Sequence, residues 1–245
     1  MQVTPLRIAM WSGPRNISTA LMRAWENRDD CVVWDEPFYG YYLQATGMPH
    51  PGAAEVIAAQ GTDVGAIIAR CIGAIPEDKQ IFYQKHMTLH LLPEIERDWL
   101  SAMVNCFLIR EPEAVIASYA AVRSDATLDD IGFIQQAELF DQVRAMSGDI
   151  PLVIDSREFL MDPATMLEAI CAKLDIEFVP AMLSWPRGPR DSDGVWAKYW
   201  YDSVCNSTGF AAYHKREYRL SDKDRAIALQ ARPYYESLYQ CRLQP

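Results

Sequence analysis

Residues 8–21 of this 245-residue chain read IAMWSGPRNISTAL, and this stretch decides the fold. A short apolar run ends at Trp11, a tight turn follows at Gly13, and a helical pattern begins near Asn16. In a strand–turn–helix start of this kind, several free backbone N–H groups point at one spot, and the helix dipole favours an anion there. The stretch therefore predicts an anion-binding loop after the first strand of an α/β fold.

Three polar side chains of this loop suit a phosphate. Arg15 adds a fixed positive charge with bidentate reach, and the hydroxyls of Ser18 and Thr19 can donate to phosphate oxygens. A Walker A loop would read G-x-x-x-x-G-K-[ST]. Gly13 and the Ser18-Thr19 pair fit its two ends, but its second Gly and its Lys are absent. The loop thus matches a P-loop in part, and an ordinary strand-to-helix turn stays open for this segment taken alone.

The rest of the chain alternates short apolar runs with helical patterns. We expect strands at residues 6–11, 31–35, 80–84, 105–109 and 151–154. We expect helices at residues 16–27, 62–75, 92–103, 112–122, 128–146, 163–174 and 221–239. Because strand and helix alternate, the sequence predicts a three-layer α/β/α fold with a central, mostly parallel sheet of about five strands.

Composition narrows the class of protein. The net charge of −10 argues against a broad nucleic-acid surface, which needs a basic face. No apolar stretch reaches the ~20 residues of a membrane span, and residues 1–10 lack the pattern of a signal peptide. The six cysteines have neither metal-site nor redox spacing and suggest buried free thiols. We therefore expect a cytoplasmic protein with no nucleic-acid or membrane partner.

The chain carries no pattern that divides it. There is no linker and no internal repeat, so we expect one domain over residues 1–245. Residues 184–193 are rich in Pro, Arg, Asp and Gly, and the aromatic run at 195–210 follows them. We expect residues 184–245 to form a C-terminal lid or helical extension of that domain. A homodimer is compatible with the sequence.

A second candidate phosphate element lies downstream, where residues 107–119 read FLIREPEAVIASY. Arg110 ends an apolar strand, Pro112 suits the first position of a helix, and Ser118 lies two turns into that helix. Arg110 would thus sit at the carboxyl edge of the sheet, where open α/β sheets bind ligands. Taken singly, Arg110 could be a surface ion-pair partner and Ser118 a residue bonded to its own backbone.

The two segments together resemble the sulfotransferase family that uses 3′-phosphoadenosine 5′-phosphosulfate (PAPS), within the P-loop sulfotransferase superfamily. In that family the first loop holds the 5′-phosphosulfate, and the Arg and Ser of the second element hold the 3′-phosphate. The resemblance implies PAPS as cofactor, 3′,5′-adenosine bisphosphate as product and no metal. It implies these cofactor-binding residues: Ser12, Gly13, Pro14, Arg15, Asn16, Ile17, Ser18, Thr19, Arg110 and Ser118. Arg15 stands where the cytosolic members often have Lys, and Ile17 stands where Gly is usual.

Residues 34–39 read WDEPFY and supply the first candidate base, Glu36. The segment is similar to the catalytic Glu-Pro segment of some bacterial and glycan sulfotransferases. At a strand end beside an aromatic wall, desolvation would raise the pKa of Glu36 towards a useful range. We expect Phe38 and Tyr39 to lie beside the substrate. A solvated loop acid is the alternative reading.

Residues 84–93 read QKHMTLHLLP and supply the second candidate base, His86. They are similar to the Lys-Thr-His…Leu-Leu-Pro stretch of cytosolic sulfotransferases. In that register His86 falls on the catalytic His, and Lys85 falls one place late for the catalytic Lys. We favour Glu36 as the base with His86 lining the site, although a structural histidine stays open. Lys85 and Arg15 complete the set of candidate catalytic residues.

The aromatic run at 195–210 suggests a substrate wall, to which we assign Trp196 and Lys198, although aromatic residues there also suit a core. Lys198 is an alternative to Lys85 for stabilising the leaving oxygen. The leading hypothesis is a sulfotransferase for a small hydroxylated or amino metabolite. A P-loop kinase using ATP and magnesium stays open, as does an inactive nucleotide-binding regulatory protein of the same fold.

Overall fold

The computed structural model describes residues 5–121 and 126–245. Across these residues, a five-stranded sheet forms with strand order β2-β3-β1-β4-β5, and every neighbouring pair is parallel. The strands are β1 (Leu6–Ser12), β2 (Cys31–Asp35), β3 (Ile81–Met87), β4 (Val104–Ile109) and β5 (Leu152–Asp155). Strand β1 lies at the centre, so the loop that follows it opens at the middle of the carboxyl-terminal edge.

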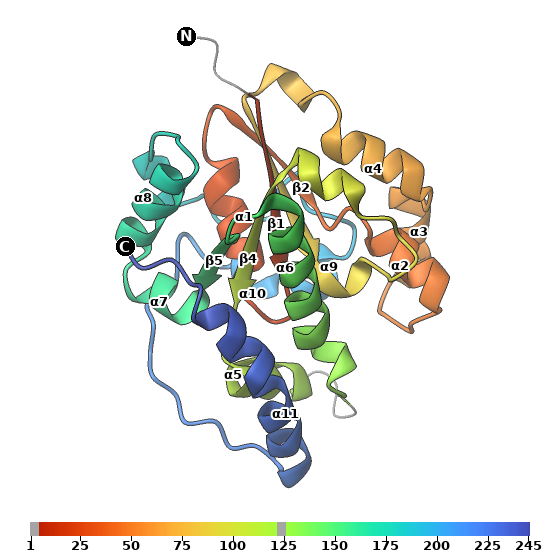
Figure 1. Cartoon of the computed structure of the whole chain (residues 1–245), viewed down its shortest axis with the longest axis vertical. Coiled ribbons are helices and arrows are strands. Elements are labelled where there is room, and N and C mark those ends of the chain that lie inside the picture. Colours follow the sequence, from red (N-terminus) through yellow and green to blue (C-terminus); the bar gives the residue numbers. More distant parts are fainter. Residues whose placement is uncertain (1–4, 122–125) are drawn as a thin grey trace.

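Helices cover both faces of the sheet (Figure 1). The helices that pack on one face are α1 (Ser18–Glu26), α7 (Ser156–Met161) and α8 (Pro163–Lys173). Those on the other face are α4 (Val64–Ile72), α5 (Pro112–Ala120), α6 (Phe133–Ser147) and α11 (Asp222–Tyr239). This arrangement confirms the predicted three-layer α/β fold.

The two faces follow from the alternation of side chains along each strand. In β1, Ile8 and Met10 pack with α1 and α8, while Ala9 and Trp11 pack with α6 and α11. All four residues are fully buried or nearly so. Because both faces are covered, the strand needs apolar residues at successive positions, which explains its near-continuous apolar run.

Several of the expected element boundaries are wrong. Strand β3 does not end at residue 84 but continues through Met87. The helix expected at 92–103 is absent except for a short 3-10 helix at Asp98–Ala102. The buried residues of that segment are Ile95, Trp99 and Leu100. Turns and the 3-10 helix bring these side chains into the core, so their helix-like spacing does not require an α-helix. The helix expected at 112–122 ends at Ala120, and residue 122 lies outside the described residues.

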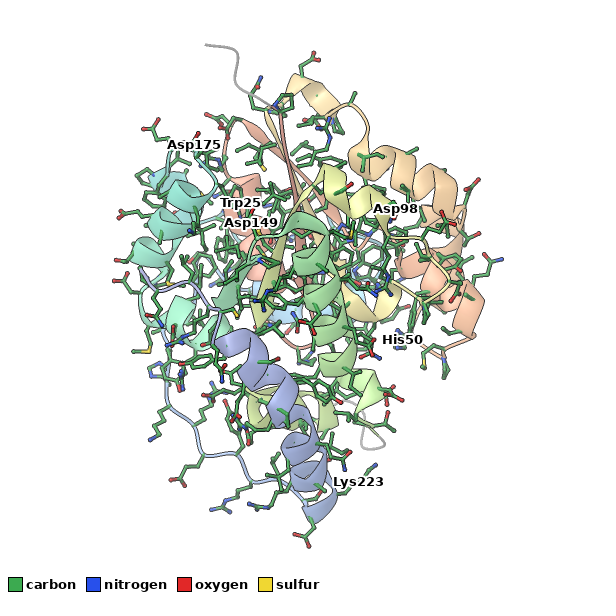
Figure 2. All side chains as sticks on the ribbon, in the orientation of Figure 1. Trp25, His50, Asp98, Asp149, Asp175 and Lys223 are labelled. Atoms are coloured by element: carbon green, nitrogen blue, oxygen red, sulfur yellow. The ribbon has the colours of Figure 1, made fainter. Side chains whose placement is uncertain are left out.

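Two helices that the sequence did not indicate follow β2. They are α2 (Tyr39–Thr46) and α3 (Ala53–Gln60), and they pack against each other. With Trp196 and Tyr201 they form a small core of their own. In Figure 2, His50 is labelled beside these helices, at the edge of the molecule. This small core brings the aromatic run at 195–210 next to the end of β2.

The residues 184–245 comprise two differently placed parts. Helix α11 contacts α5 and α6, and its Ala228, Ala231 and Leu238 belong to the main core. Figure 1 shows α11 running alongside α6. Ser221 caps this helix by accepting the backbone N–H of Asp224 at 3.1 Å. The short helices α9 (Ala197–Trp200) and α10 (Asp202–Cys205) instead border the carboxyl-terminal edge of the sheet.

All six cysteines lie in the described part of the chain and are free thiols, four of them buried. Over the same residues, none of the helices by itself has the length and apolar character to cross a membrane. The pair α3 and α4, extended through Asp78 and bent by 61°, meets that requirement by length and composition alone.

Candidate active site

A cavity of about 430 Å³ opens at the carboxyl-terminal edge of the sheet. The loop after β1, together with Arg110 after β4 and Ser118 of α5, lines one side. Glu36 after β2 and Lys85 of β3 line the other side. Open parallel sheets bind ligands at such an edge, where the connections from neighbouring strands leave in opposite directions. The fold thus gathers residues from four strand ends around one cavity.

The loop after β1 is held by its own side chains. Asn16 donates from Nδ2 to the carbonyl of Leu108 at 3.1 Å, and its Oδ1 accepts the N–H of Ile17 at 2.8 Å. Arg15 has a φ of 58°, in the left-handed region that residues other than glycine seldom adopt. Helix α1 begins at Ser18, and the N–H groups of its first turn have no acceptor within the helix. The loop residues that line the cavity are Pro14, Arg15, Asn16, Ile17, Ser18, Thr19 and Ala20.

The first two residues of the expected cofactor loop lie behind it rather than on the cavity. Ser12 is fully buried, and its carbonyl accepts the hydroxyl of Thr88 at 3.3 Å. A Cβ at Gly13 would lie 2.9 Å from the carbonyl oxygen of Ile131. Gly13 therefore lets the loop pack closely against the segment before α6. Ser12 and Gly13, which were expected among the cofactor-binding residues, therefore do not line the cavity.

Two arginines and a serine lie together on the side of the cavity formed by the loop after β1. Arg110 donates from Nη1 to the backbone carbonyl of Arg15 at 2.5 Å, and Arg15 donates from Nε to the Ser118 hydroxyl at 2.9 Å. Burial and the neighbouring Arg110 charge lower the pKa of Arg15. Within 5–121 and 126–245, no carboxylate forms an ion pair with either guanidinium. A chain with a net charge of −10 thus keeps local positive charge here.

Lys85 lies at the centre of a buried polar cluster. Its Nζ donates to Asp35 Oδ1 at 2.8 Å, to Glu36 Oε1 at 2.5 Å and to the Tyr201 hydroxyl at 2.8 Å. An ammonium has three donors, so these contacts use all of them. Burial alone would lower the pKa of Lys85, but the two carboxylates outweigh it and raise the pKa well above the usual value. Lys85 is therefore a charged residue held by the protein, and its donors do not point freely at a leaving oxygen.

Glu36 stands at the turn between β2 and α2. Its φ of 44° is again left-handed, while its N–H still donates to the Lys85 carbonyl at 2.8 Å, as a continuation of the sheet. The side chain of Gln60 donates to the Glu36 carbonyl at 2.9 Å and fixes the turn. Burial raises the pKa of Glu36, and Asp35 adds to the rise, against the opposing effect of Lys85. Because one ammonium faces two carboxyls, Glu36 is the member of the cluster placed to take up a proton.

His90 lines the cavity, and the sequence patterns did not single it out. Its Nδ1 lies 3.7 Å from Glu36 Oε2, and its ring stacks between Tyr39 and Tyr42 at centroid distances of 4.6 and 4.8 Å. Burial, with the neighbouring His50 and Lys85, lowers the pKa of His90 well below its usual value, so the ring is neutral. Its position directly before the Leu-Leu-Pro segment was the available signal.

His86 does not line the cavity, contrary to the expectation. It is fully buried, stacks on Trp11 at 4.3 Å, and its Nε2 lies 3.2 Å from Gln84 Oε1. Burial and the Lys85 charge lower its pKa to about 3. The physical reason is the continuation of β3: neighbouring residues of a strand point to opposite faces, so Lys85 and His86 cannot both face the site. His86 lies on the core side.

Of the residues expected at the substrate, Tyr39 lines the cavity and three others do not. Phe38 is buried against Trp99, with ring centroids 5.7 Å apart. Trp196 is buried and donates from Nε1 to the Tyr201 hydroxyl at 3.1 Å. Lys198 is 55% exposed and pairs with Glu55 at 2.6 Å. The aromatic run does supply the wall, through Trp200 and Tyr201, which the sequence did not distinguish from their neighbours.

The described residues contain no group of three or more His, Cys, Asp or Glu side chains arranged to hold a metal ion.

Comparison with known proteins places the chain in a family. The model of a family described as "Sulfotransferase domain" matches residues 6–242. Two curated proteins of Arabidopsis thaliana are similar to the chain. "Branched-chain-amino-acid aminotransferase-like protein 1" is 35% identical over 222 residues, and protein 2 of that name is 32% identical over 208 residues. These matches cover 90% and 85% of this chain, which spans only 40% and 37% of the two relatives.

Solved structures agree on the fold. The "Sulfotransferase Domain from the Curacin Biosynthetic Pathway" has a TM-score of 0.55 and 15% identity, covering 92% of this chain and 97% of that one. The "Sulfotransferase Domain from the Synechococcus PCC 7002 Olefin Synthase" has a TM-score of 0.52 and 18% identity, covering 93% and 94%. At these identities the likeness concerns the fold alone. Because the family model matches nearly the whole length, this chain belongs to the sulfotransferase domain family.

Proposed function

We propose that this chain transfers a sulfuryl group from PAPS to a hydroxyl or amine of a small molecule. One observation carries the proposal: the same cavity is lined by Arg15 and Arg110 on one side and by the buried Glu36–Lys85 pair on the other. Family membership supports sulfuryl transfer, and the arrangement of charge in the cavity supports PAPS as the donor. The six free cysteines suit a reducing compartment, and we place the reaction in the cytoplasm.

The donor side suits a nucleotide with phosphate at two positions. Arg110 and Ser118 would hold the 3′-phosphate, since a guanidinium makes charge-assisted hydrogen bonds and a hydroxyl adds another donor. Arg15 and the first turn of α1 would hold the 5′ end. Ile17, at the position where Gly is usual, packs partly into the core beside α1. The left-handed backbone at Arg15 bends the loop, so the bend does not depend on a glycine at position 17.

Sulfuryl transfer requires that the acceptor lose a proton as its oxygen or nitrogen bonds to sulfur and the bond from sulfur to the phosphate oxygen breaks. Glu36 would take that proton, because its carboxyl lines the cavity and burial raises its pKa. Arg15 and Arg110 would stabilise the negative charge that the phosphate gains. Lys85 would act by holding Glu36, since its own donors are engaged.

The acceptor side is walled mainly by aromatic rings. Tyr39, Tyr42, His90 and Trp200 line it, and the His90 ring is neutral. These rings favour a compact, largely apolar body, while Glu36 provides the carboxylate that a hydroxyl or amine would approach. The proposed acceptor is therefore a small alcohol or amine rather than a polysaccharide.

Titration calorimetry tests the donor assignment. The protein should bind adenosine 3′,5′-bisphosphate without metal and more tightly than adenosine 5′-phosphate, because only the first ligand engages both phosphate positions. A radiolabelled PAPS assay over a panel of small alcohols and amines then tests transfer. Magnesium-dependent binding of ATP in place of the bisphosphate would support a kinase. Absence of binding by either nucleotide would support a regulatory protein that has kept the fold.

A further inference from the structure

The Lys85 cluster brings together three distant parts of the chain. Asp35 ends β2, Lys85 lies in β3, and Tyr201 comes from the segment between α9 and α10. Asp35, Lys85 and Tyr201 are all buried, with exposed fractions of 2%, 1% and 5%. Burying an ammonium and a carboxylate is unfavourable unless each finds partners of good geometry. Such a cluster calls for an explanation beyond packing.

Every polar group in the cluster has a partner. The Tyr201 hydroxyl donates to Asp35 Oδ2 at 2.6 Å and accepts from Lys85 Nζ at 2.8 Å and from Trp196 Nε1 at 3.1 Å. Asp35 therefore receives two donors, one from Lys85 and one from Tyr201. Glu36 receives one from Lys85 within the cluster and otherwise faces the cavity. Of the two carboxyls, Asp35 is the more fully satisfied.

The charge balance follows from these contacts. One ammonium lies between two carboxyls, so the cluster carries one negative charge more than its positive charge when both acids are ionised. If Asp35 were absent, Lys85 and Glu36 would form a simple ion pair, and a carboxylate in such a pair is a weak base. Asp35 competes with Glu36 for Lys85 and prevents that outcome.

We propose that Asp35 and Tyr201 are positioning residues of the transfer site, which share the Lys85 ammonium with Glu36 so that the Glu36 carboxyl faces the cavity as an effective base. The inference rests on the proposed function, in which Glu36 takes the acceptor proton. Asp35 supplies the competing negative charge. Tyr201 holds Asp35 in place by donating to it, and it occupies one of the three donors of Lys85.

The groups that face Glu36 determine its titration. They come from its own strand end, from β3, from the turn after β3, from α2 and from the segment at 201. They are Asp35, Lys85, His90, Tyr39 and Tyr201. The two positioning residues act on Glu36 in the same sense, because each occupies one donor of the Lys85 ammonium. Asp35 also raises the pKa of Glu36 through its charge. Removal of either residue should let Lys85 pair more closely with Glu36 and lower the pKa of Glu36.

The test is a carboxyl ¹³C NMR titration of the full chain labelled at glutamate, with the Glu36 signal assigned from Glu36→Gln. In Asp35→Asn we expect the Glu36 midpoint to move down by about one pH unit or more, because a neighbouring negative charge is gone. In Tyr201→Phe we expect a smaller movement in the same direction, because Lys85 loses an acceptor and pairs more closely with Glu36. The matched control is Tyr235→Phe, which removes a tyrosine hydroxyl that donates to the buried Asp155 at 2.9 Å, and it should leave the midpoint unmoved.

An unmoved or raised midpoint in either cluster variant overturns the inference. If Asp35→Asn does not fold, Tyr201→Phe decides alone, and a midpoint that stays or rises in that variant overturns it. The titration needs neither donor nor acceptor. Failure of the wild-type protein to bind adenosine 3′,5′-bisphosphate would overturn the proposed function instead, and the two failures are thereby separable.

Discussion

The guanidinium of Arg15 donates from Nε to the hydroxyl of Ser118, 103 residues further along the chain, at 2.9 Å. The bond joins the loop after β1 to helix α5 on one side of the cavity. In the resemblance that the sequence suggests, these two residues serve opposite ends of the donor. Their direct contact makes the donor side one continuous polar surface, on which the arginines lie side by side without an acidic partner among the described residues.

Replacing Arg110 should separate the two phosphate positions. Arg110→Ala should weaken binding of adenosine 3′,5′-bisphosphate by roughly 10- to 100-fold, since hydrogen bonds to charged groups contribute about 1.5–3 kcal/mol. Binding of adenosine 5′-phosphate should change far less. Calorimetry with both ligands measures the difference. Arg232→Ala is the control, because Arg232 pairs with Glu113 outside the cavity lining. Equal losses for the two nucleotides would refute the assignment.

Replacing Glu36 should separate binding from turnover. Glu36→Gln keeps the size of the side chain but removes the base, so we expect unchanged affinity for adenosine 3′,5′-bisphosphate and a loss of turnover of about 10²- to 10⁴-fold. Wild-type turnover should also fall as the pH drops through the pKa of Glu36, because the base must be deprotonated. Calorimetry and the PAPS assay provide the two measurements. A Glu36→Gln protein with wild-type turnover would require another base.

Gly13 should tolerate no side chain. Its Cβ would lie 2.9 Å from the Ile131 carbonyl, so Gly13→Ala must displace either the loop or the segment before α6. Overpacking of this kind destabilises by about 1–3 kcal/mol. We expect a lower melting temperature together with weaker bisphosphate binding. Gly65→Ala is the matched control: Gly65 is exposed in α4, where alanine is the better helix former, and stability should hold or rise. A Gly13→Ala protein as stable as wild type would contradict the close contact.

His86 should make the fold sensitive to mild acid. Its pKa is about 3 in the folded chain, and a histidine in an unfolded chain has a pKa of about 6.5. Between these values the unfolded state binds the proton and the folded state does not, so stability is lost as the pH falls below about 6.5. The loss amounts to about 2 kcal/mol at pH 5.

Urea unfolding at pH 7.5 and pH 5 measures this loss. His86→Gln retains a donor for Gln84. Between the two conditions, its free energy of unfolding should fall by about 2 kcal/mol less than that of wild type. His214→Gln, at an exposed position, should show the same change in the free energy of unfolding between pH 7.5 and pH 5 as wild type. If His86→Gln showed the same acid sensitivity as wild type, a charge on buried His86 would not be its source.

The sequence was sufficient for the sheet and for placing Arg15, Arg110 and Ser118 at one cavity. Apolar runs covered on both faces identify all five strands of the described residues, and a strand end places Arg110 at the correct edge. The side-chain directions in β3 were harder to predict. Whether Lys85 or His86 faces the cavity depends on how far the strand continues, and the strand expected at 80–84 ends three residues too early.

The acceptor side depends on packing between distant segments, which no local pattern encodes. His90 lies at the cavity because α2 stacks Tyr39 and Tyr42 on either side of it. Tyr201 reaches Lys85 only after the chain has passed through β4, β5 and α8. In the sequence, Tyr201 is one of several aromatic residues close together. By residue type alone, Trp196 and Lys198 suit a place in the cavity wall equally well. Only the folded chain distinguishes the residue that contacts Lys85 from those beside it.

The contact between Tyr201 and Lys85 also has a consequence for synthesis. The two residues are 116 positions apart, so a growing chain holds Asp35, Glu36 and Lys85 long before the hydroxyl that completes their cluster leaves the ribosome. Until then, the nascent sheet carries a buried ammonium and a carboxylate that lack one partner, an arrangement that disfavours a settled native core. The Lys85 cluster thus forms only once residue 201 has been made, and a chain terminated between β5 and that residue would lack the cluster even where its sheet is complete.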